Sequence, residues 1–272
     1  GFYLFLLIEL PLKRPEAGGI LRQQCVPIVV NSDEVRKQWA ERSGEYSPSY
    51  YAYYGPDETS EMILDLLDSF VGSDAAVLEL GCSSGRHLAH LHEHGFEEVH
   101  GIEINDEAFD VMADAYPDLA EAGTFYNDPI EEVAPEFPDR RFDAVFSVET
   151  LQHIHPDDEA VFGELARITD DALLTVENED RDGDPPEGDE SESDESDADR
   201  EEGTPRTEGE TDTQSDVPED VEEQARRGVN YVNEEVPLYY RDWNRIFTEL
   251  GFGEVESRAT KRDTLRAFRR TN

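Results

Sequence analysis

The sequence predicts an α/β protein in which a mostly parallel sheet is covered by helices on both faces, a three-layer sandwich. Two patterns support this prediction. From Asp57 onward, short apolar runs alternate with longer amphipathic stretches, which is the order of a β-α-β-α series. Near the end of the chain, two strand-like runs follow each other without a helix, which indicates an antiparallel hairpin. Since buried strands joined by helices pair in parallel with right-handed crossovers, one sheet accommodates all of these runs.

The first predicted element of this core is a helix that begins near Asp57. Asp57 suits the N-cap, Glu58 and Glu61 suit the first turn, and apolar residues recur on one face as far as Phe70. The strands expected next are short apolar runs at 76–80, 99–104, 124–126, 142–147 and 173–176, with helices between them. A helix over 242–250 and two strands over 255–259 and 264–268 complete the predicted core.

The charge of the chain is unusual. Its 272 residues include 66 acidic and 23 basic residues, a formal net charge of -43, and only three of the basic residues are lysine. Residues 179–223 carry 22 acids and three arginines, a net charge of -19, which leaves -24 for the rest of the chain. Such a surface repels nucleic acid and stays hydrated in concentrated salt, where electrostatic screening is short-ranged. We therefore expect a halophilic, cytoplasmic protein with no nucleic-acid partner.

Composition divides the chain into four parts. Residues 1–31 open with an apolar segment that is too short to span a bilayer, and we interpret them as an extension of uncertain status, a fragment or a misassigned start rather than a membrane-skimming anchor. Residues 32–56 are interpreted as a helical cap, and residues 57–178 together with 229–272 as the α/β domain. Residues 179–228 are interpreted as an acidic insertion, expected to be disordered because it has almost no core-forming residues. No integral membrane span is expected.

The two cysteines, Cys25 and Cys82, are far apart and have no metal-ligand spacing, so no metal site is predicted. They are too few for a disulfide framework, which fits a reducing cytoplasm.

The most informative stretch is 77–87, VLELGCSSGRH, in which a predicted strand leads into a glycine turn and a helix. Gly81 lets the backbone turn sharply after the strand, and Gly85 permits a ligand to approach the helix N-terminus, whose free N–H groups attract an anionic group. A dinucleotide-binding fingerprint reads G-x-G-x-x-G, and here Ser83 stands in place of the second glycine. The stretch therefore predicts a nucleotide-binding corner with little room for a pyrophosphate.

The spacing Glu79-x-Gly81-x-x-x-Gly85 resembles motif I of class I S-adenosylmethionine-dependent methyltransferases. Two further acids match this family. Glu103 ends the second strand, where the family's carboxylate accepts both ribose hydroxyls, and Asp128 follows the third, where the family's acid accepts from the adenine amino group. The segment 142–147 resembles the family's fourth-strand motif beside the methionine moiety.

This resemblance covers residues 57–178 and 229–272, and the acidic composition is typical of a haloarchaeal protein. It implies a Rossmann-like fold with a seven-stranded, mostly parallel sheet that ends in an antiparallel hairpin, and S-adenosylmethionine as cofactor. The cofactor-binding residues that it implies are Glu79, Gly81, Cys82, Ser83, Gly85, Glu103, Ile104, Asp128, Ile130 and Ser147.

The resemblance places the methyl acceptor at the carboxyl ends of the fourth and fifth strands. Methyl transfer is an in-line displacement that needs alignment and some help with proton removal. His153 is the first candidate for the base because the unperturbed pKa of histidine is near neutrality, and Glu149 is the second. The alternative for His153 and His155 is a loop pair that caps the helix starting near Pro156.

Five tyrosines lie within residues 46–54, just before the first core helix. They suit a lid over a small substrate, or equally the packing of a helix against the sheet edge. Arg86 could meet a carboxylate of the substrate or cofactor, although a surface position is the simpler interpretation.

The chain lacks the Asn/Asp-Pro-Pro-aromatic run that follows the fourth strand in enzymes methylating nucleobase amino groups. We therefore expect a small-molecule or glycan acceptor, with methylation of a hydroxyl or carboxyl oxygen rather than of a nucleobase. One alternative is an NAD(P)-dependent oxidoreductase, although no Tyr-x-x-x-Lys pair or second substrate domain is evident. Another is a non-catalytic S-adenosylmethionine-binding protein whose acidic segment recruits a partner.

Overall fold

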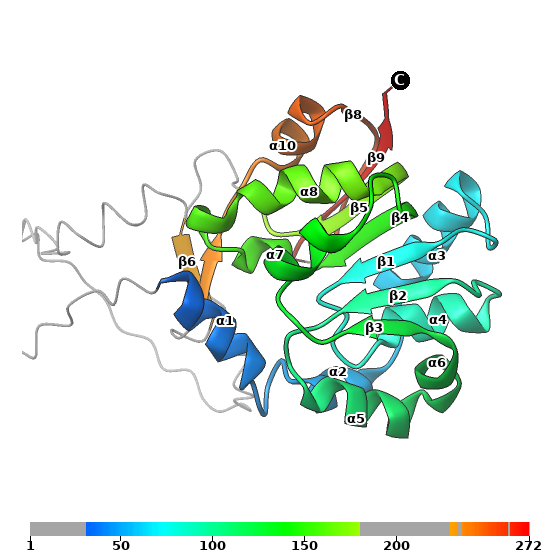
Figure 1. The fold of residues 1–272 in the computed structure, drawn as a ribbon, viewed down its shortest axis with the longest axis vertical. Helices are drawn as coiled ribbons and strands as arrows, with labels where there is room; N and C mark the ends of the chain where they lie inside the picture. Colours follow the sequence, from blue (N-terminus) through cyan, green and yellow to red (C-terminus); the bar gives the residue numbers. More distant parts are fainter. Residues whose placement is uncertain (1–30, 180–228, 233–235, 261, 272) are drawn as a thin grey trace, which may run out of the picture.

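The computed structural model describes residues 31–179, 229–232, 236–260 and 262–271. Seven strands form one sheet in the order β3-β2-β1-β4-β5-β9-β8 (Figure 1). Strands β1 to β5 are parallel, and β9 runs antiparallel to both β5 and β8. The strands are β1 (Val77–Leu80), β2 (Val99–Ile102), β3 (Thr124–Tyr126), β4 (Phe142–Val148), β5 (Thr169–Glu177), β8 (Phe252–Ala259) and β9 (Thr264–Arg270). The predicted fold class, including the antiparallel C-terminal hairpin, is confirmed.

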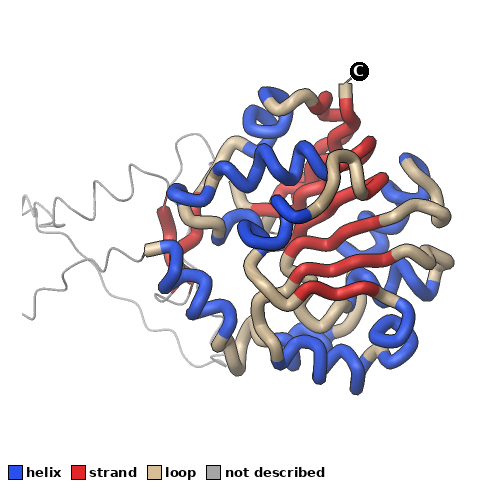
Figure 2. The backbone as a smooth tube through the Cα atoms, viewed as in Figure 1, coloured by secondary structure: helices blue, strands red, loops and turns tan. Residues whose placement is uncertain are grey.

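Helices cover both faces of this sheet, as Figure 2 shows in blue against the red strands. On one face lie α3 (Glu58–Phe70), α4 (Arg86–Glu93), α5 (Glu107–Ala115) and α6 (Pro117–Ala122). On the other lie α7 (Ile130–Val133), α8 (Ala160–Ile168) and α10 (Trp243–Glu249). Short 3-10 turns occupy Ala134–Glu136, Leu151–His153 and Pro156–Asp158.

Each face of the sheet has its own hydrophobic core because successive side chains of a strand point to opposite faces. In β1, Leu78 and Leu80 belong to the core beneath α8 and α10, whereas Val77 belongs to the core beneath α3 and α4. All four residues of β1 are buried, as expected of a central parallel strand.

The start of α3 agrees with its sequence signal. The side chain of Asp57 accepts from the backbone N–H groups of Thr59 and Ser60, and the hydroxyl of Ser60 accepts from the backbone N–H of Asp57. This reciprocal capping fixes the entry of the chain into the core.

Strand β5 begins four residues before the predicted start at residue 173. Asp170 and Asp171 conceal the start of the strand because the sequence pattern treats acids as loop residues. In the structure both carboxylates contact arginines at the edge of the sheet: Asp170 lies 3.3 Å from Arg140, and Asp171 forms an ion pair with Arg269.

The cap predicted for residues 32–56 contains two helices, α1 (Ser32–Ala40) and α2 (Pro48–Tyr54). Helix α2 packs against α5, and α1 packs against a two-stranded antiparallel sheet of β6 (Val229–Val232) and β7 (Val236–Tyr239). The strands predicted from the sequence do not include this small sheet. The extension before residue 31 and the insertion at 180–228 lie outside the described residues. Among the helices that the structure describes, none is long and apolar enough to cross a membrane.

Candidate functional site

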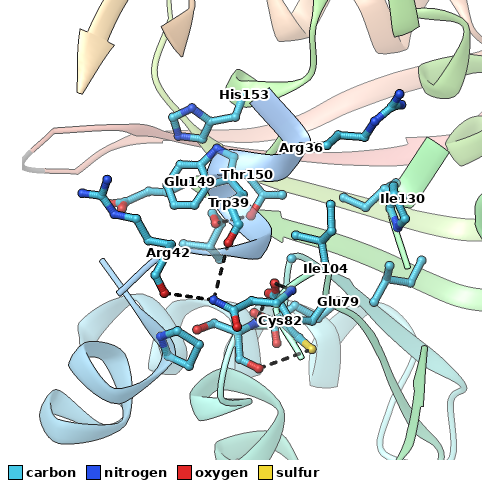
Figure 3. A pocket seen from close by; sticks show the side chains of 18 of the residues that line it. Arg36, Trp39, Arg42, Glu79, Cys82, Ile104, Ile130, Glu149, Thr150 and His153 are labelled. Atoms are coloured by element: carbon cyan, nitrogen blue, oxygen red, sulfur yellow. Dashed lines mark hydrogen bonds between the residues drawn. The ribbon is translucent and has the colours of Figure 1, made fainter. Parts of the chain in front are cut away.

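A cavity lies at the carboxyl ends of β1 and β2. Its far wall comes from the loop after β4 and from α1 of the cap, so that it is enclosed by the sheet edge and the cap (Figure 3). From β1 the chain adds strands β2 and β3 on one side of β1, and it then returns to add β4 and β5 on the other side. Ligands of open α/β sheets bind at this kind of switch point.

The two glycines of the turn after β1 have different roles. Gly81 has a positive φ of 66°, and a Cβ there would collide with the side chain of Thr150, so a glycine is needed where the loops after β1 and β4 meet. Gly85 precedes α4 with a φ of 81°, and a Cβ there would lie 2.8 Å from Leu119 and 2.9 Å from Met112. Gly85 does not line the cavity. Its neighbours are packed side chains, and its ligand contact stays a prediction.

Ser83 lies between these glycines in the left-handed region, with a φ of 48°. This conformation turns its backbone N–H toward Glu103, whose Oε2 accepts from it at 2.8 Å. The other carboxylate oxygen of Glu103 accepts from the backbone N–H of Asn105, also at 2.8 Å. Since a carboxylate has about four acceptor positions, both oxygens can accept further hydrogen bonds from a ligand.

Burial raises the pKa of Glu103, and the backbone N–H groups of Asn105 and Ser83 counteract this shift by favouring the charged form. Ile104, Asp128 and Ile130 line the cavity beside Glu103, as the sequence suggested.

Glu79 lies at the floor of the cavity and is 2% exposed. Its Oε2 has no hydrogen-bond partner among the residues that the structure describes. Burial raises the pKa of Glu79 well above its ordinary value, the charge of Arg86 opposes this shift, and the nearby Glu103 adds to it. In the same wall, burial raises the pKa of the Cys82 thiol. Glu79 is therefore a buried acid of raised pKa with one oxygen that the described residues leave without a partner.

His153 lines the cavity opposite Glu79, and its ring contacts that of Trp39 with 4.6 Å between centroids. Its Nδ1 lies 3.0 Å from the carbonyl oxygen of Pro237, so Nδ1 carries the hydrogen. Burial lowers the pKa of His153 to about 4. The near-neutral pKa that made His153 the first candidate for the base is thus absent from this structure. His155 does cap the 3-10 turn at Pro156–Asp158, by accepting from the backbone N–H of Asp157.

Glu149, the second candidate for the base, also lines the cavity and has a positive φ of 49°. Its carboxylate lies 2.9 Å from the Arg262 guanidinium, which comes from the turn between β8 and β9. The neighbouring Asp263 has a pKa raised to about 8, first by burial and then by the charge of Glu149. Glu149 is therefore a carboxylate with two ionisable neighbours at the cavity mouth.

Ser147 is not among the residues that line the cavity, and its role in cofactor binding stays a prediction. The side chain is fully buried at the end of β4, and its hydroxyl donates to Glu177. The same carboxylate accepts from the backbone N–H groups of three successive residues, Thr150, Leu151 and Gln152, at 3.0 to 3.2 Å. Glu177 thus holds the turn that presents Thr150 and His153 to the cavity.

Several cavity residues were missed in the sequence. Arg36, Trp39 and Arg42 line the cavity from α1 and the residues that follow it. Their spacing of three residues puts them on one side of a helix, and this was the available signal. The sequence predicted a helical cap in this region, but it did not predict which side of the helix lines the cavity.

The tyrosine-rich segment lies partly at the cavity and partly at the surface. Tyr46 and Tyr51 line the cavity, whereas Tyr53 is 84% exposed. The Arg86 guanidinium lies 4.9 Å from the centre of the Tyr51 ring and 3.0 Å from Asp57. Arg86 therefore connects the cap to the start of α3 at the edge of the cavity. It is not simply a surface residue.

Comparison with known proteins identifies this domain. Residues 77–171 match the family model described as a methyltransferase domain. A search of curated proteins finds no match to the chain.

Solved structures with a similar fold include 1,6-didemethyltoxoflavin-N1-methyltransferase from Burkholderia thailandensis, with 15% identity, a TM-score of 0.51 and 79% of each chain covered. Magnesium protoporphyrin IX methyltransferase from Synechocystis has 14% identity and a TM-score of 0.50, over 89% of this chain and 93% of that one. A protein from Pyrococcus horikoshii has 16% identity and a TM-score of 0.51, over 83% and 95%. At these identities the similarities show a shared fold.

The fold and the cavity at its switch point define an α/β enzyme of the Rossmann-like type. The domain match then specifies its chemistry: the chain is an S-adenosylmethionine-dependent methyltransferase. The match is to a methyltransferase domain and not to an oxidoreductase, so the alternative of a nicotinamide-dependent enzyme is set aside.

Proposed function

We propose that the cavity binds S-adenosylmethionine with its ribose on Glu103, and that the enzyme methylates a hydroxyl or carboxyl oxygen of a small molecule or glycan. The observation that carries the proposal is the pair of acids at the ends of β1 and β2. Glu79 and Glu103 converge on one cavity, and each has acceptor capacity that the protein leaves unused.

The ribose is assigned to Glu103 because two backbone amides hold its carboxylate in a fixed orientation, one on each oxygen. A carboxylate fixed in this way can accept from two neighbouring hydroxyls without losing side-chain entropy on binding. Asp128 and the apolar side chains of Ile104 and Ile130 lie beside it on the cavity wall, where they suit the amino group and the faces of an adenine.

Glu79 provides the test of fit for the rest of the cofactor. A buried acid of raised pKa with an unpartnered oxygen suits a ligand that brings a positive charge, since a nearby cation favours the charged form of the acid. S-adenosylmethionine carries a cationic ammonium and a sulfonium, and when bound it supplies an electrophilic methyl group. The turn at Gly81, with Cys82 and Ser83, lines the cavity next to Glu79 and leaves room for that part of the ligand.

The acceptor is assigned to the opposite wall, between α1 and the loop after β4. Trp39, Thr150 and His153 line this part of the cavity, and the indole Nε1 of Trp39 is buried without a hydrogen-bond partner among the described residues. An acceptor oxygen could accept from this N–H. His153 is too weak a base at a pKa of about 4 to remove a proton efficiently, so it serves to position the acceptor.

Glu149, which lines the cavity beside Thr150, could take a proton from a hydroxyl acceptor. A carboxylate acceptor needs no base, because its oxygen is already ionised at neutral pH. The arginines Arg36 and Arg42 on the same wall would complement its charge. We infer further that the enzyme acts in a reducing, salty cytoplasm, which its buried free thiol at Cys82 and its acidic composition support.

Calorimetry in molar KCl tests the cofactor assignment. S-adenosylhomocysteine should bind the parent protein, and Glu103→Ala should lose at least tenfold in affinity, since each hydrogen bond to a charged group contributes roughly 1.5 to 3 kcal/mol. NAD should not bind. Glu98→Ala is the matched control, because Glu98 lies just before β2 at the opposite edge of the sheet, paired with Arg141 at 3.0 Å. Equal affinity in the parent and Glu103→Ala would reject the ribose assignment.

The acceptor class is tested with a radiolabelled methyl donor and a panel of carboxylic acids, hydroxylated sugars and single-stranded DNA. Label is expected in the first two groups. Transfer to DNA alone would contradict the proposed substrate class.

A further inference from the structure

One residue bridges the cofactor wall and the acceptor wall of the cavity. Asn105 follows Glu103 in the loop after β2, and its side chain is buried, with 3% of its surface exposed. It uses every polar group in a different contact. Its backbone N–H donates to Glu103, and its Oδ1 accepts from the backbone N–H of Glu107 at the start of α5.

The amide nitrogen of Asn105 reaches into the cap. Nδ2 donates to the carbonyl oxygen of Arg42 at 3.0 Å and to that of Trp39 at 3.4 Å; Figure 3 draws both hydrogen bonds as dashed lines. The Arg42 carbonyl lies two residues beyond the end of α1, and the Trp39 carbonyl, in the last turn of α1, also accepts from the backbone N–H of Arg42 at 3.2 Å. Asn105 thus connects the C-terminal end of α1, through its nitrogen, to the start of α5, through its oxygen.

The contact matters for the cavity because α1 carries Trp39. The Trp39 ring is 4.6 Å from that of His153, and both line the proposed acceptor wall. Arg36 of the same helix reaches Asp158 at 3.4 Å, so α1 is held at its other side by the segment before α8. The contacts form a continuous path from Glu103 through Asn105 to Trp39 and His153.

We propose that Asn105 is a positioning residue that latches α1 to the cofactor loop, so that ligand binding at Glu103 stabilises the Trp39 wall and prepares the acceptor site. This rests on the proposed function in one respect, namely that the cofactor contacts Glu103. A ligand that fixes the Glu103 carboxylate also fixes the loop carrying Asn105. Through the hydrogen bonds of Asn105, α1 then becomes less mobile as well. By linkage, closure of α1 strengthens cofactor binding to the same extent.

Asparagine is the residue type that this position requires. Aspartate or serine would keep an acceptor for the N-terminus of α5 and would lose the two donated hydrogen bonds to α1. Asn105→Asp and Asn105→Ser therefore separate the latch from the α5 cap, and serine does so without adding a charge next to Glu103.

Asn127 offers a matched control. Its Nδ2 also donates to two backbone carbonyls, those of Glu103 at 3.0 Å and Ile104 at 3.3 Å, but it makes no contact with α1 among the described residues. Asn127→Asp removes the same type of hydrogen bond from the same loop and leaves the latch intact.

Tryptophan fluorescence is the readout. The chain contains two tryptophans, Trp39 and Trp243, so a Trp243→Phe background leaves Trp39 as the only reporter. Acrylamide quenching is measured in molar KCl, without ligand and with saturating S-adenosylhomocysteine. In the background protein the ligand should protect Trp39 from quenching.

In Asn105→Asp and Asn105→Ser, Trp39 should be more accessible without ligand, and the ligand should protect it less. The population of the open form should rise roughly fivefold, the factor that corresponds to a net hydrogen bond of about 1 kcal/mol. Asn127→Asp should behave as the background does, and circular dichroism checks that each variant is folded.

Quenching of Trp39 in both Asn105 variants that equals the background, with and without ligand, would overturn the latch. Failure of the background protein to bind S-adenosylhomocysteine would instead reject the proposed function, while the comparison without ligand would still test the contact between Asn105 and α1.

Discussion

Burial shifts the pKa values of two cavity side chains in opposite directions, Glu79 on the floor and His153 on the wall of the β4 loop. Because burial disfavours the charged form of a group, it raises the pKa of Glu79 and lowers that of His153 to about 4. The cavity wall therefore disfavours charge on both side chains, and it suits a cofactor that brings its own positive charge.

The pKa of His153, lowered to about 4, predicts that the ring stays neutral with its hydrogen on Nδ1 at pH 6. The folded-state pKa lies below the unfolded value near 6.5. The folded state is therefore at its full stability above pH 6.5, where the ring is neutral in both states, and it loses stability as the pH falls toward 4. Nuclear magnetic resonance of histidine-labelled protein should show that the His153 ring does not titrate between pH 5 and 7; the buried His87, with a pKa lowered to about 3, should not titrate there either. His153→Gln identifies its signals, and a midpoint near 6.5 for those signals would contradict the prediction.

At this scale the sequence predicted Glu103 and Asp128 because acids at the ends of parallel strands meet at one edge of the sheet. It could not predict the pKa of His153, which depends on burial beneath Trp39 and β7, far away in the chain. The hydrogen bond from Ser147 to Glu177 could not be predicted for a related reason, because Glu177 comes from the adjacent strand β5.

The turn at Leu151–His153 illustrates how one element shapes the site through another. Glu177 ends β5 and accepts three backbone N–H groups from the loop after β4, which the turn itself leaves without partners. Sequence reasoning found the loop and both strands, since each has a strong local pattern. It could not find the small sheet of β6 and β7, whose stability depends on packing against α1.

Glu177 has a pKa raised to about 7, chiefly by burial and against the influence of its hydrogen bonds. The folded-state pKa lies above the unfolded value near 4.5, so stability is full below pH 4.5 and falls as the pH rises through 7. A shift of this size corresponds to on the order of 3 kcal/mol. Denaturant unfolding at several pH values should therefore show a steeper decline in the parent protein than in Glu177→Gln.

The exposed Glu249→Gln serves as the control for this comparison and should follow the parent. Identical pH profiles for the parent and Glu177→Gln would contradict the shifted pKa of Glu177.

For the whole molecule, the dominant property is the net charge of -43. Many arginines connect acids from different elements: Arg266 bridges Glu179 and Glu254, and Arg167 contacts Asp139 and Glu164. These pairs offset only part of the repulsion, because acids outnumber basic residues by nearly three to one. The excess of acidic residues follows from composition alone, whereas the ion-pair partners of each arginine could be identified only from the fold.

We therefore predict that folding requires salt. The melting temperature should rise from dilute buffer to molar KCl as screening reduces the self-repulsion of the carboxylates. NaCl at equal ionic strength is the control for a specific potassium effect. A melting temperature that does not depend on salt would contradict the prediction.

Strand β9 lies between β5 and β8, inside the sheet, although β5 and β9 are far apart in the sequence. Trp243, Phe247 and Phe268 of this C-terminal part belong to the same core as Phe162 of α8, and Glu179 pairs with Arg241 across the gap. What holds the last strand is thus burial and strand pairing rather than covalent continuity. The enzyme should accordingly work as a fragment-complementation pair: residues 1–179 and 229–272, produced as two separate polypeptides in molar KCl, should copurify through a tag on either one and bind S-adenosylhomocysteine together. Fragments that elute separately would show that the intervening chain is needed to close the sheet.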